Sequence, residues 1–482
     1  MLFNTVQFML FFVVVVTAFF ALPARWRNPF LLVASYYFYM CWSTTYIFVI
    51  WAITLIDFVA GLLIERTDAA LRRRMLLGAS VLCNFGLLFV LKYANFFGGT
   101  VNAIGDRLGI PVHFSALNLL LPVGISFHTF QAVSYTVEVY RRRVPAERDL
   151  IKYALYVAFF PQMVAGPIER PYNLLPQFVP QKEPRLDRFR SGLQMALWGL
   201  FKKAAIADLV APLVAQVYGA PRTFSGPILA LATLMFSVQI YCDFSGYSDI
   251  AIGIARIMGY DLMINFRAPY FARSISEFWH RWHISLSSWF RDYLYIPLGG
   301  NRVSRMRWYV NLMIVFLVSG LWHGANWPFV LWGGLHGFYL IFGVATSSFR
   351  ARLRSVIGLA DRPLLHRGLQ MITTFFLATV AWVFFRANSV GDALWIVRHF
   401  ASVGGFHLTD IWGLGLPRFE MTLAFVLIAA LFIVEWLIVE TPRVVVGWWS
   451  AWPLRWACYY ACAFGIVFFG VFKHLQFIYF QF

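Results

Sequence analysis

The sequence is poor in charged side chains, which make up 13% of its 482 residues. A soluble domain carries about 25% charged and about 45–50% apolar residues. Here 60% of the residues are hydrophobic, which argues against a soluble domain and is typical of a polytopic membrane protein. Because apolar runs recur along the whole chain, we expect one integral membrane domain over residues 1–482.

Acidic residues are the scarcer of the two charged classes. The chain has 22 Asp and Glu against 40 Lys and Arg, for a formal net charge of +18. In a soluble protein this excess would indicate nucleic-acid binding. In a membrane protein, basic residues gather in cytoplasmic loops and meet anionic headgroups. We therefore expect membrane lipid, and no nucleic acid, as a partner.

Motifs for metal binding and for secretion are also missing. The five cysteines show no C-x-x-C pair, and no H-E-x-x-H sequence occurs, so we expect no metal site. No basic residue precedes the apolar run 8–22 and no convincing A-x-A site follows it. This run is expected to be a retained first span and not a cleaved signal peptide.

The chain shows no internal repeat and no low-complexity linker, which disfavours a transporter built from inverted repeats. Counting about 20 residues per full span, we predict an all-α helix bundle of about 11–13 membrane segments, some of them short or re-entrant. The apolar runs lie near 3–22, 29–42, 45–64, 75–97, 119–140, 150–165, 192–217, 227–257, 307–326, 328–347, 370–386, 421–440 and 455–475.

Basic residues alternate between loops. They follow the first run at Arg25 and Arg27, the third at 72–74 and the fifth at 141–143, whereas loop 98–118 is nearly uncharged. The positive-inside rule then predicts an N-terminus on the outer side of a bacterial inner membrane. The stretch 260–310 mixes many Arg with Trp and Tyr, so we expect an interfacial or re-entrant helix and a loop there.

Histidines supply the candidate chemistry. The run 317–337 has no formally charged residue but contains His323 and His336. An ionisable group at membrane depth costs about 3 kcal/mol, so it usually has a role. Three interpretations stay open for His323: a hydrogen-bonded structural residue, a metal ligand, or a general base that takes a proton from an alcohol.

A second group of polar residues lies upstream. His280 and His283 are three residues apart and would share a face of a helix, with Glu277 one turn earlier. Asp243 and Asp249 stand among small and apolar residues in YCDFSGYSDIAIG. Each aspartate could orient a histidine, line a tunnel, or form hydrogen bonds between packed helices.

Several blocks in order resemble the membrane-bound O-acyltransferase (MBOAT) family, most of all its alginate O-acetyltransferase membrane-subunit branch. They spread over nearly the whole chain, with the core motifs within 120–340. The matching blocks are PVGISFHTFQAVSYTVEVYR (122–141), FPQMVAGPIER (160–170), YCDFSGYSDIAIG (241–253), FWHRWHISLSSWFRDYLYIPLGGNR (278–302), LVSGLWHGANWPFVLWGGLHG (317–337) and FIYFQF (477–482).

The resemblance implies a helix bundle with a funnel from each side and a central tunnel. His323 matches the family's near-invariant histidine, and His283 matches a second important histidine. The implied activity passes an acetyl group from a cytoplasmic thioester, acetyl-CoA, across the membrane for O-acetylation of an exopolysaccharide such as alginate or cellulose. The implied partners are periplasmic acetyltransferase or acceptor proteins, and no cofactor is held permanently.

The remaining site residues are assigned by chemistry. Arg291, Arg302 and Arg305 are candidates to bind the donor's phosphates, because Arg suits phosphate geometry. The candidate tunnel-lining residues are Asp243, Asp249, Trp322 and Asn326. Two alternative functions stay open: transfer of D-alanine or of an acyl group to a lipid, and a non-enzymatic polysaccharide or lipid transporter.

Overall fold

The computed structural model describes residues 1–118, 122, 124–164, 166–179, 182–441, 451–471 and 478. Within these residues every regular element is a helix, which confirms the all-α prediction. Among the described residues, six helices are long and apolar enough to cross a membrane: α3 (Ile47–Arg66), α12 (Gly226–Ile257), α16 (Trp327–Ala345), α18 (Pro363–Arg386), α20 (Arg418–Glu440) and the continuous helix Ala70–Leu108. The larger number of segments predicted from the apolar runs included short and re-entrant ones, and it stays a prediction.

The chain divides into two compact units. Unit 1 comprises Met1–Ala196 and Ile250–Met263, and unit 2 comprises Leu197–Asp249 and Ile264–Phe482. The helices of unit 1 are α1 (Val6–Ala21), α2 (Ala24–Met40), α3 (Ile47–Arg66), α4 (Ala70–Leu88), the π-helix η1 (Phe89–Tyr93), α5 (Ala94–Leu108), α6 (Ile125–Tyr140), α7 (Leu150–Ala158), α8 (Phe160–Met163), α9 (Pro171–Leu174), η2 (Leu175–Gln177) and the start of α10 (Leu186–Leu200).

Unit 2 holds the central and C-terminal helices. These are η3 (Phe201–Ala207, a π-helix), α11 (Asp208–Gly219), η4 (Pro221–Thr223), most of α12 (Gly226–Ile257), η5 (Pro269–Phe271), α13 (Ile275–Arg281), α14 (Ile284–Phe290), η6 (Arg291–Tyr295, a π-helix), α15 (Arg305–His323), α16 (Trp327–Ala345), α17 (Ser347–Val356), α18 (Pro363–Arg386), α19 (Val390–His399), η7 (Leu408–Gly413), α20 (Arg418–Glu440) and α22 (Trp452–Phe469). Most of the helices coincide with the apolar runs of the sequence.

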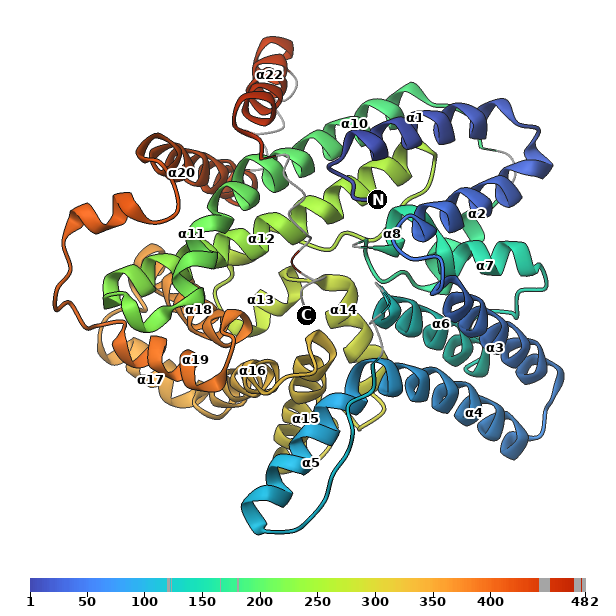
Figure 1. Ribbon diagram of the computed structural model, residues 1–482, viewed down its shortest axis with the longest axis horizontal. Coiled ribbons are helices and arrows are strands. Elements are labelled where there is room, and N and C mark those ends of the chain that lie inside the picture. Colours follow the sequence, from blue (N-terminus) through green and yellow to red (C-terminus); the bar gives the residue numbers. More distant parts are fainter. Residues whose placement is uncertain are drawn as a thin grey trace. The chain divides into compact units, whose positions relative to one another are not determined.

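In unit 1, α3, α4 and α6 lie side by side (Figure 1). They share a buried polar centre. Asp57 of α3 accepts hydrogen bonds from Ser80 Oγ at 2.5 Å, Thr136 Oγ1 at 2.5 Å and Asn84 Nδ2 at 2.7 Å. All four side chains are buried. Because the donors come from α4 and α6, this carboxyl group ties three helices together.

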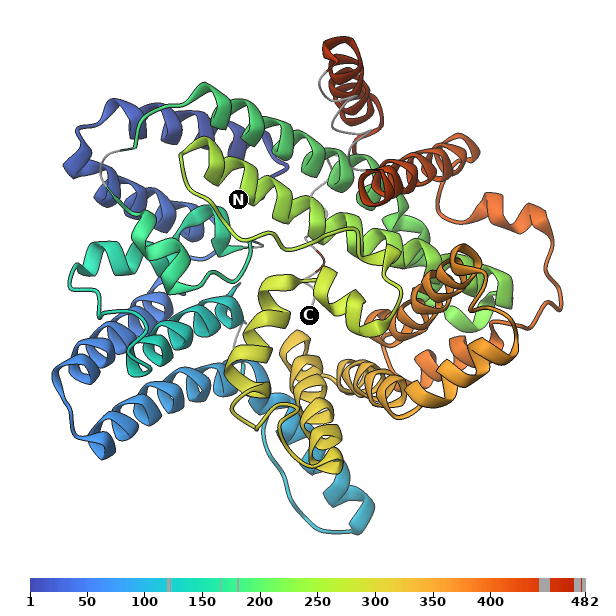
Figure 2. The same ribbon diagram turned by 180° about the vertical axis from the view of Figure 1, so that it is seen from behind.

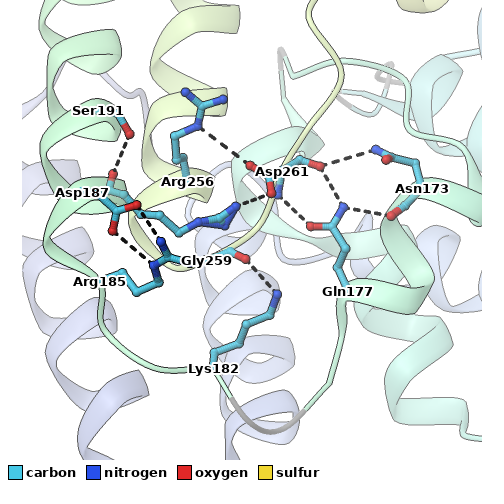
Figure 3. Close-up of polar contacts among 10 residues, drawn as sticks. Asn173, Gln177, Lys182, Arg185, Asp187, Ser191, Arg256, Gly259 and Asp261 are labelled. Atoms are coloured by element: carbon cyan, nitrogen blue, oxygen red, sulfur yellow. Dashed lines mark hydrogen bonds and ion pairs between the residues drawn. The ribbon is translucent and has the colours of Figure 1, made fainter.

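A second polar cluster in unit 1 surrounds Asp261 (Figure 3). Its carboxylate pairs with Arg188, and its backbone N–H donates to Gln177 Oε1 at 2.7 Å. Nearby, Lys182 Nζ donates to the Gly259 carbonyl at 2.8 Å. These bonds join α10 and the segment before it to the loop that follows α12, so basic residues at 182 and 188 hold this loop in place.

In unit 2, α15 and α16 form an antiparallel hairpin (Figure 2). Glycine allows their close approach, since a Cβ added to Gly320 would lie 2.3 Å from the Phe329 carbonyl oxygen. A Cβ on Gly333 would lie 2.1 Å from the Phe316 carbonyl oxygen. The turn ends at Asn326, the N-cap of α16, whose Oδ1 accepts from Trp327 N at 2.8 Å.

Candidate active site

His323 is the last residue of α15, at the closed end of the hairpin. Its side chain is buried, with 3% of the residue exposed. The imidazole lies edge to face against Trp322 and Trp332, with both centroid distances 4.9 Å, and against Phe385 at 5.3 Å. The local sequence therefore builds an aromatic enclosure around the one residue that the resemblance marks as most important.

His283 lies on the other side of Trp322, with a ring-centroid distance of 6.0 Å. It is fully buried and sits between α13 and α14, where it takes the left-handed backbone conformation with φ of 42°. The expectation that His280 and His283 share one helix face is wrong, because α13 ends at Arg281. His280 is exposed and bonds to the Ser276 carbonyl through Nδ1 at 2.7 Å.

A buried asparagine, Asn265, contacts His283, and no motif in the sequence predicted its role. Asn265, from the extended segment before η5, holds His283 through a 3.0 Å contact between Oδ1 and Nδ1. Its Nδ2 donates to Ser248 Oγ of α12 at 3.2 Å. A polar amide in the apolar run LMINF was the available signal.

His336 of α16 completes a chain of aromatic contacts. Its Nδ1 accepts a hydrogen bond from the Trp279 indole at 3.3 Å, and its ring lies 5.0 Å from Trp332. Trp332 in turn touches His323. His336 is thus hydrogen-bonded within the bundle and supports the wall of the His323 enclosure.

A cavity of about 380 Å³ runs along α15 and α16. Trp279, Phe316 and Ser319 contribute to its wall, and Ser319 lies one helical turn before His323. The size is within the range of small-molecule sites, about 300–1,000 Å³. The residues that line the cavity are Ser276, Trp279, His280, Ile284, Leu286, Ser287, Ser288, Phe290, Arg291, Tyr295, Trp308, Leu312, Val315, Phe316, Ser319, Leu340 and Val344.

The three candidate phosphate-binding arginines differ in position. Arg291 lines the cavity, is 59% exposed in its side chain, and pairs with Asp292 at 2.8 Å. Arg302 and Arg305 do not line it, and Arg305 Nε donates to Tyr309 Oη at 2.7 Å. Arg305 begins the helix that His323 ends, so about 27 Å of helix separates them at 1.5 Å per residue.

The candidate tunnel-lining aspartates form ion pairs with buried lysines in unit 2. Asp243 Oδ1 lies 2.6 Å from Lys203 Nζ, and Asp249 Oδ2 lies 2.6 Å from Lys202 Nζ. Lys203 also pairs with Asp208 at 2.7 Å. Both lysines lie in the π-helix η3, an irregularity that often marks functional segments.

The other two candidates take different places. Trp322 is buried between the two histidines, as described above. Asn326 is exposed and caps α16. Among the described residues no group of three or more His, Cys, Asp or Glu side chains is arranged to hold a metal ion.

Comparison with known proteins places these features in context. Residues 142–356 match the membrane-bound O-acyltransferase family. The chain is 40% identical over 415 residues to the probable alginate O-acetylase AlgI of Azotobacter vinelandii, covering 84% of this chain and 80% of that protein.

Two further relatives carry different names. The peptidoglycan O-acetyltransferase of Helicobacter pylori is 34% identical over 447 residues, covering 85% of this chain and 82% of that protein. The teichoic acid D-alanyltransferase of Streptococcus thermophilus is 31% identical over 249 residues, covering 48% of this chain and 58% of that protein.

Proposed function

Because this chain belongs to the membrane-bound O-acyltransferase family, and is thus a multi-pass membrane acyltransferase, we propose that it transfers acetyl groups to a polysaccharide. The donor is a cytoplasmic thioester, acetyl-CoA, and periplasmic partner proteins complete the transfer outside a bacterial inner membrane. Two of the relatives named above, a probable alginate O-acetylase and a peptidoglycan O-acetyltransferase, are named for the acetylation of a polymer, and both match this chain over most of its length.

The single observation that carries the proposal is the environment of His323, an imidazole enclosed by Trp322, Trp332 and Phe385 at the end of α15. Its role is general base. It takes the proton of an acceptor hydroxyl as that oxygen attacks the thioester carbonyl. When the tetrahedral intermediate collapses, the carbon–sulfur bond breaks and the leaving thiolate takes the proton back from the imidazolium.

The cavity beside α15 is large enough for the thioester end of the proposed donor, acetyl-CoA. Its lining includes Ser319, one turn before His323, and Arg291, which offers a cation for phosphate. Because His323 is enclosed, the reacting groups meet it only when the aromatic side chains between the cavity and the ring move. The same enclosure keeps water from the thioester.

The test uses membranes that contain the full chain and acetyl-CoA labelled in the acetyl group. Replacing His323→Ala should lower label transfer by about 10²–10⁴-fold at equal membrane levels, as expected for loss of a general base. His113→Ala, in an exposed loop, is the control. Transfer near wild type by the His323 variant would refute the assignment.

The alternatives predict different outcomes of the same experiment. A transporter would consume no thioester in any variant. A D-alanyltransferase would ignore acetyl-CoA and accept an alanyl thioester. The D-alanyltransferase relative covers only 48% of this chain, which favours acetyl transfer.

A further inference from the structure

The contact between Asn265 and His283 determines where the proton of His283 lies. Both residues are buried, and Asn265 Oδ1 is 3.0 Å from His283 Nδ1. A neutral imidazole carries its hydrogen on only one nitrogen, and the other nitrogen is an acceptor. The partner of Nδ1 therefore decides the tautomer.

The orientation of the Asn265 amide is fixed by a neighbour that can only donate. The backbone N–H of Ser285 points at the same Asn265 atom, at 3.3 Å, and the Ser285 hydroxyl lies 3.0 Å from it. An amide nitrogen in that place would face a backbone N–H, donor against donor. The atom that faces His283 is hence the oxygen, and Nδ1 of His283 must carry the hydrogen.

The backbone supports the same arrangement. The Asn265 carbonyl accepts from Ile284 N at 3.0 Å, so Asn265 bonds to residues 283, 284 and 285 in succession. These bonds stabilise the left-handed conformation of His283, which is strained for a residue with a Cβ. Strain of this kind concentrates at functional sites.

His283 also stays uncharged. It lies outside the six candidate spans, and burial lowers the pKa of its imidazole to about 3. Phe244 meets the ring edge to face with centroids 4.6 Å apart. Burial therefore disfavours the imidazolium, and the tautomer set by Asn265 is the working form at neutral pH.

We propose that Asn265 is a positioning residue that holds His283 as the Nδ1–H tautomer, so that Nε2 acts only as a hydrogen-bond acceptor. The proposal rests on the acyl transfer proposed above and narrows the part that His283 takes in it. His283 accepts a hydrogen bond from the hydroxyl of the acceptor and orients its oxygen toward the thioester. It does not stabilise the oxyanion, because a lone pair at Nε2 would repel that oxygen.

The first experiment reads the tautomer without using activity. Purified protein labelled with ¹⁵N in its histidines gives distinct Nδ1–H and Nε2–H signals, and a His283→Gln variant assigns the one that belongs to residue 283. We expect an Nδ1–H signal that is lost or moved in Asn265→Leu. An Nε2–H signal for His283 in the wild-type protein would overturn the proposal, whatever the protein catalyses.

The second experiment measures acetyl transfer from labelled acetyl-CoA across pH. Asn265→Leu cannot accept from Nδ1 and should lower kcat by about 10²-fold, the lower range for loss of a correctly placed acid–base group. Asn265→Asp keeps an acceptor and adds a negative charge. It should restore most of the activity and move the acidic limb of the pH profile upward, because a carboxylate beside Nδ1 favours the imidazolium.

The variant Asn311→Leu is the control that separates a purely structural effect of losing a buried asparagine from the proposed effect on His283. Asn311 is equally buried in unit 2 and donates to the Leu298 and Gly300 carbonyls. Its replacement should lower stability but leave the pH profile of the folded enzyme in place. If Asn265→Leu fails to fold, the tautomer of His283 in the wild-type protein and the pH profile of Asn265→Asp still test the proposal. A pH profile of Asn265→Asp that equals the wild-type profile counts against it. A wild-type protein without acetyl transfer refutes the proposed function alone.

Discussion

The imidazole of His323 meets the indole of Trp332 edge to face, with ring centroids 4.9 Å apart. Trp332 is fully buried and also touches His336 and Trp382. Trp332 therefore forms part of the His323 enclosure and also contacts Trp279, which lines the cavity. This arrangement gives Trp332 a role in excluding water that can be measured apart from catalysis.

Trp332→Phe keeps an aromatic ring but leaves a void beside His323. We expect polysaccharide acetylation to fall while release of free acetate from acetyl-CoA rises, because water reaches the thioester. The ratio of acetate to transferred acetyl should increase about 10-fold, which is roughly 1.4 kcal/mol of partitioning. Trp395→Phe is the control, since Trp395 also contacts a histidine, His399, away from the enclosure. An unchanged ratio would show that Trp332 only fills space.

The buried ion pairs of η3 predict a large effect on stability. Lys203 Nζ lies 2.7 Å from Asp208 and 2.6 Å from Asp243, and all three side chains are nearly inaccessible. Lys203→Met leaves two buried carboxylates without their cation, which typically costs about 3–5 kcal/mol. Thermal unfolding in detergent should show a much lower midpoint.

The coupling within this cluster is testable as well. Adding Asp208→Asn and Asp243→Asn to Lys203→Met removes the unpaired charges and should recover part of the loss. Arg222→Met, which breaks an exposed pair with Asp392 at 3.8 Å, should change the midpoint little. Equal effects of Lys203→Met and Arg222→Met would contradict the buried network.

The sequence predicted the helices well because membrane helices follow apolar length. The ends of α12, α16 and α20 lie within about three residues of the apolar runs. The break at His283 was not visible, since neither glycine nor proline marks it. Its left-handed backbone depends on Asn265, 18 residues away in the chain.

Long-range pairing explains the other differences. Lys202 and Lys203 lie close in sequence to the basic stretch 182–190, which suggests an exposed basic segment, but they are buried against Asp249, Asp243 and Asp208. Arg302 and Arg305 are near Arg291 in sequence, yet a turn and the start of α15 place them away from the cavity. Local patterns carry no information about such partners.

Asp57 gives a prediction for unit 1. Asp57→Ala removes the acceptor of Ser80, Thr136 and Asn84, and each buried donor left unpaired costs about 1–3 kcal/mol. We expect the unfolding free energy to fall by about 3 kcal/mol or more. Asp57→Asn, which keeps one carbonyl oxygen, should lose less. Asp68→Ala, on an exposed side chain paired with Arg142, should be almost neutral, and a neutral Asp57→Ala would show that the three helices pack without this centre.

Glu169 predicts how stability depends on pH. Burial raises the pKa of this carboxyl to about 7, although Met263 N and Asn173 Nδ2 each donate to it at 2.6 Å. The folded protein therefore binds this proton more tightly than the unfolded chain, whose Glu has a pKa near 4.3. The stability that protonated Glu169 contributes is complete below the pKa of the unfolded chain and is lost as pH rises through about 7.

Thermal unfolding at pH 5 and pH 7.5 should show a lower midpoint at the higher pH. Glu169→Gln should reduce this difference because the glutamine cannot ionise. Glu420→Gln, which removes an acidic side chain from α20, is the control and should leave the difference between the two midpoints unchanged. If Glu169→Gln also leaves it unchanged, Glu169 is already ionised in the folded protein at pH 5.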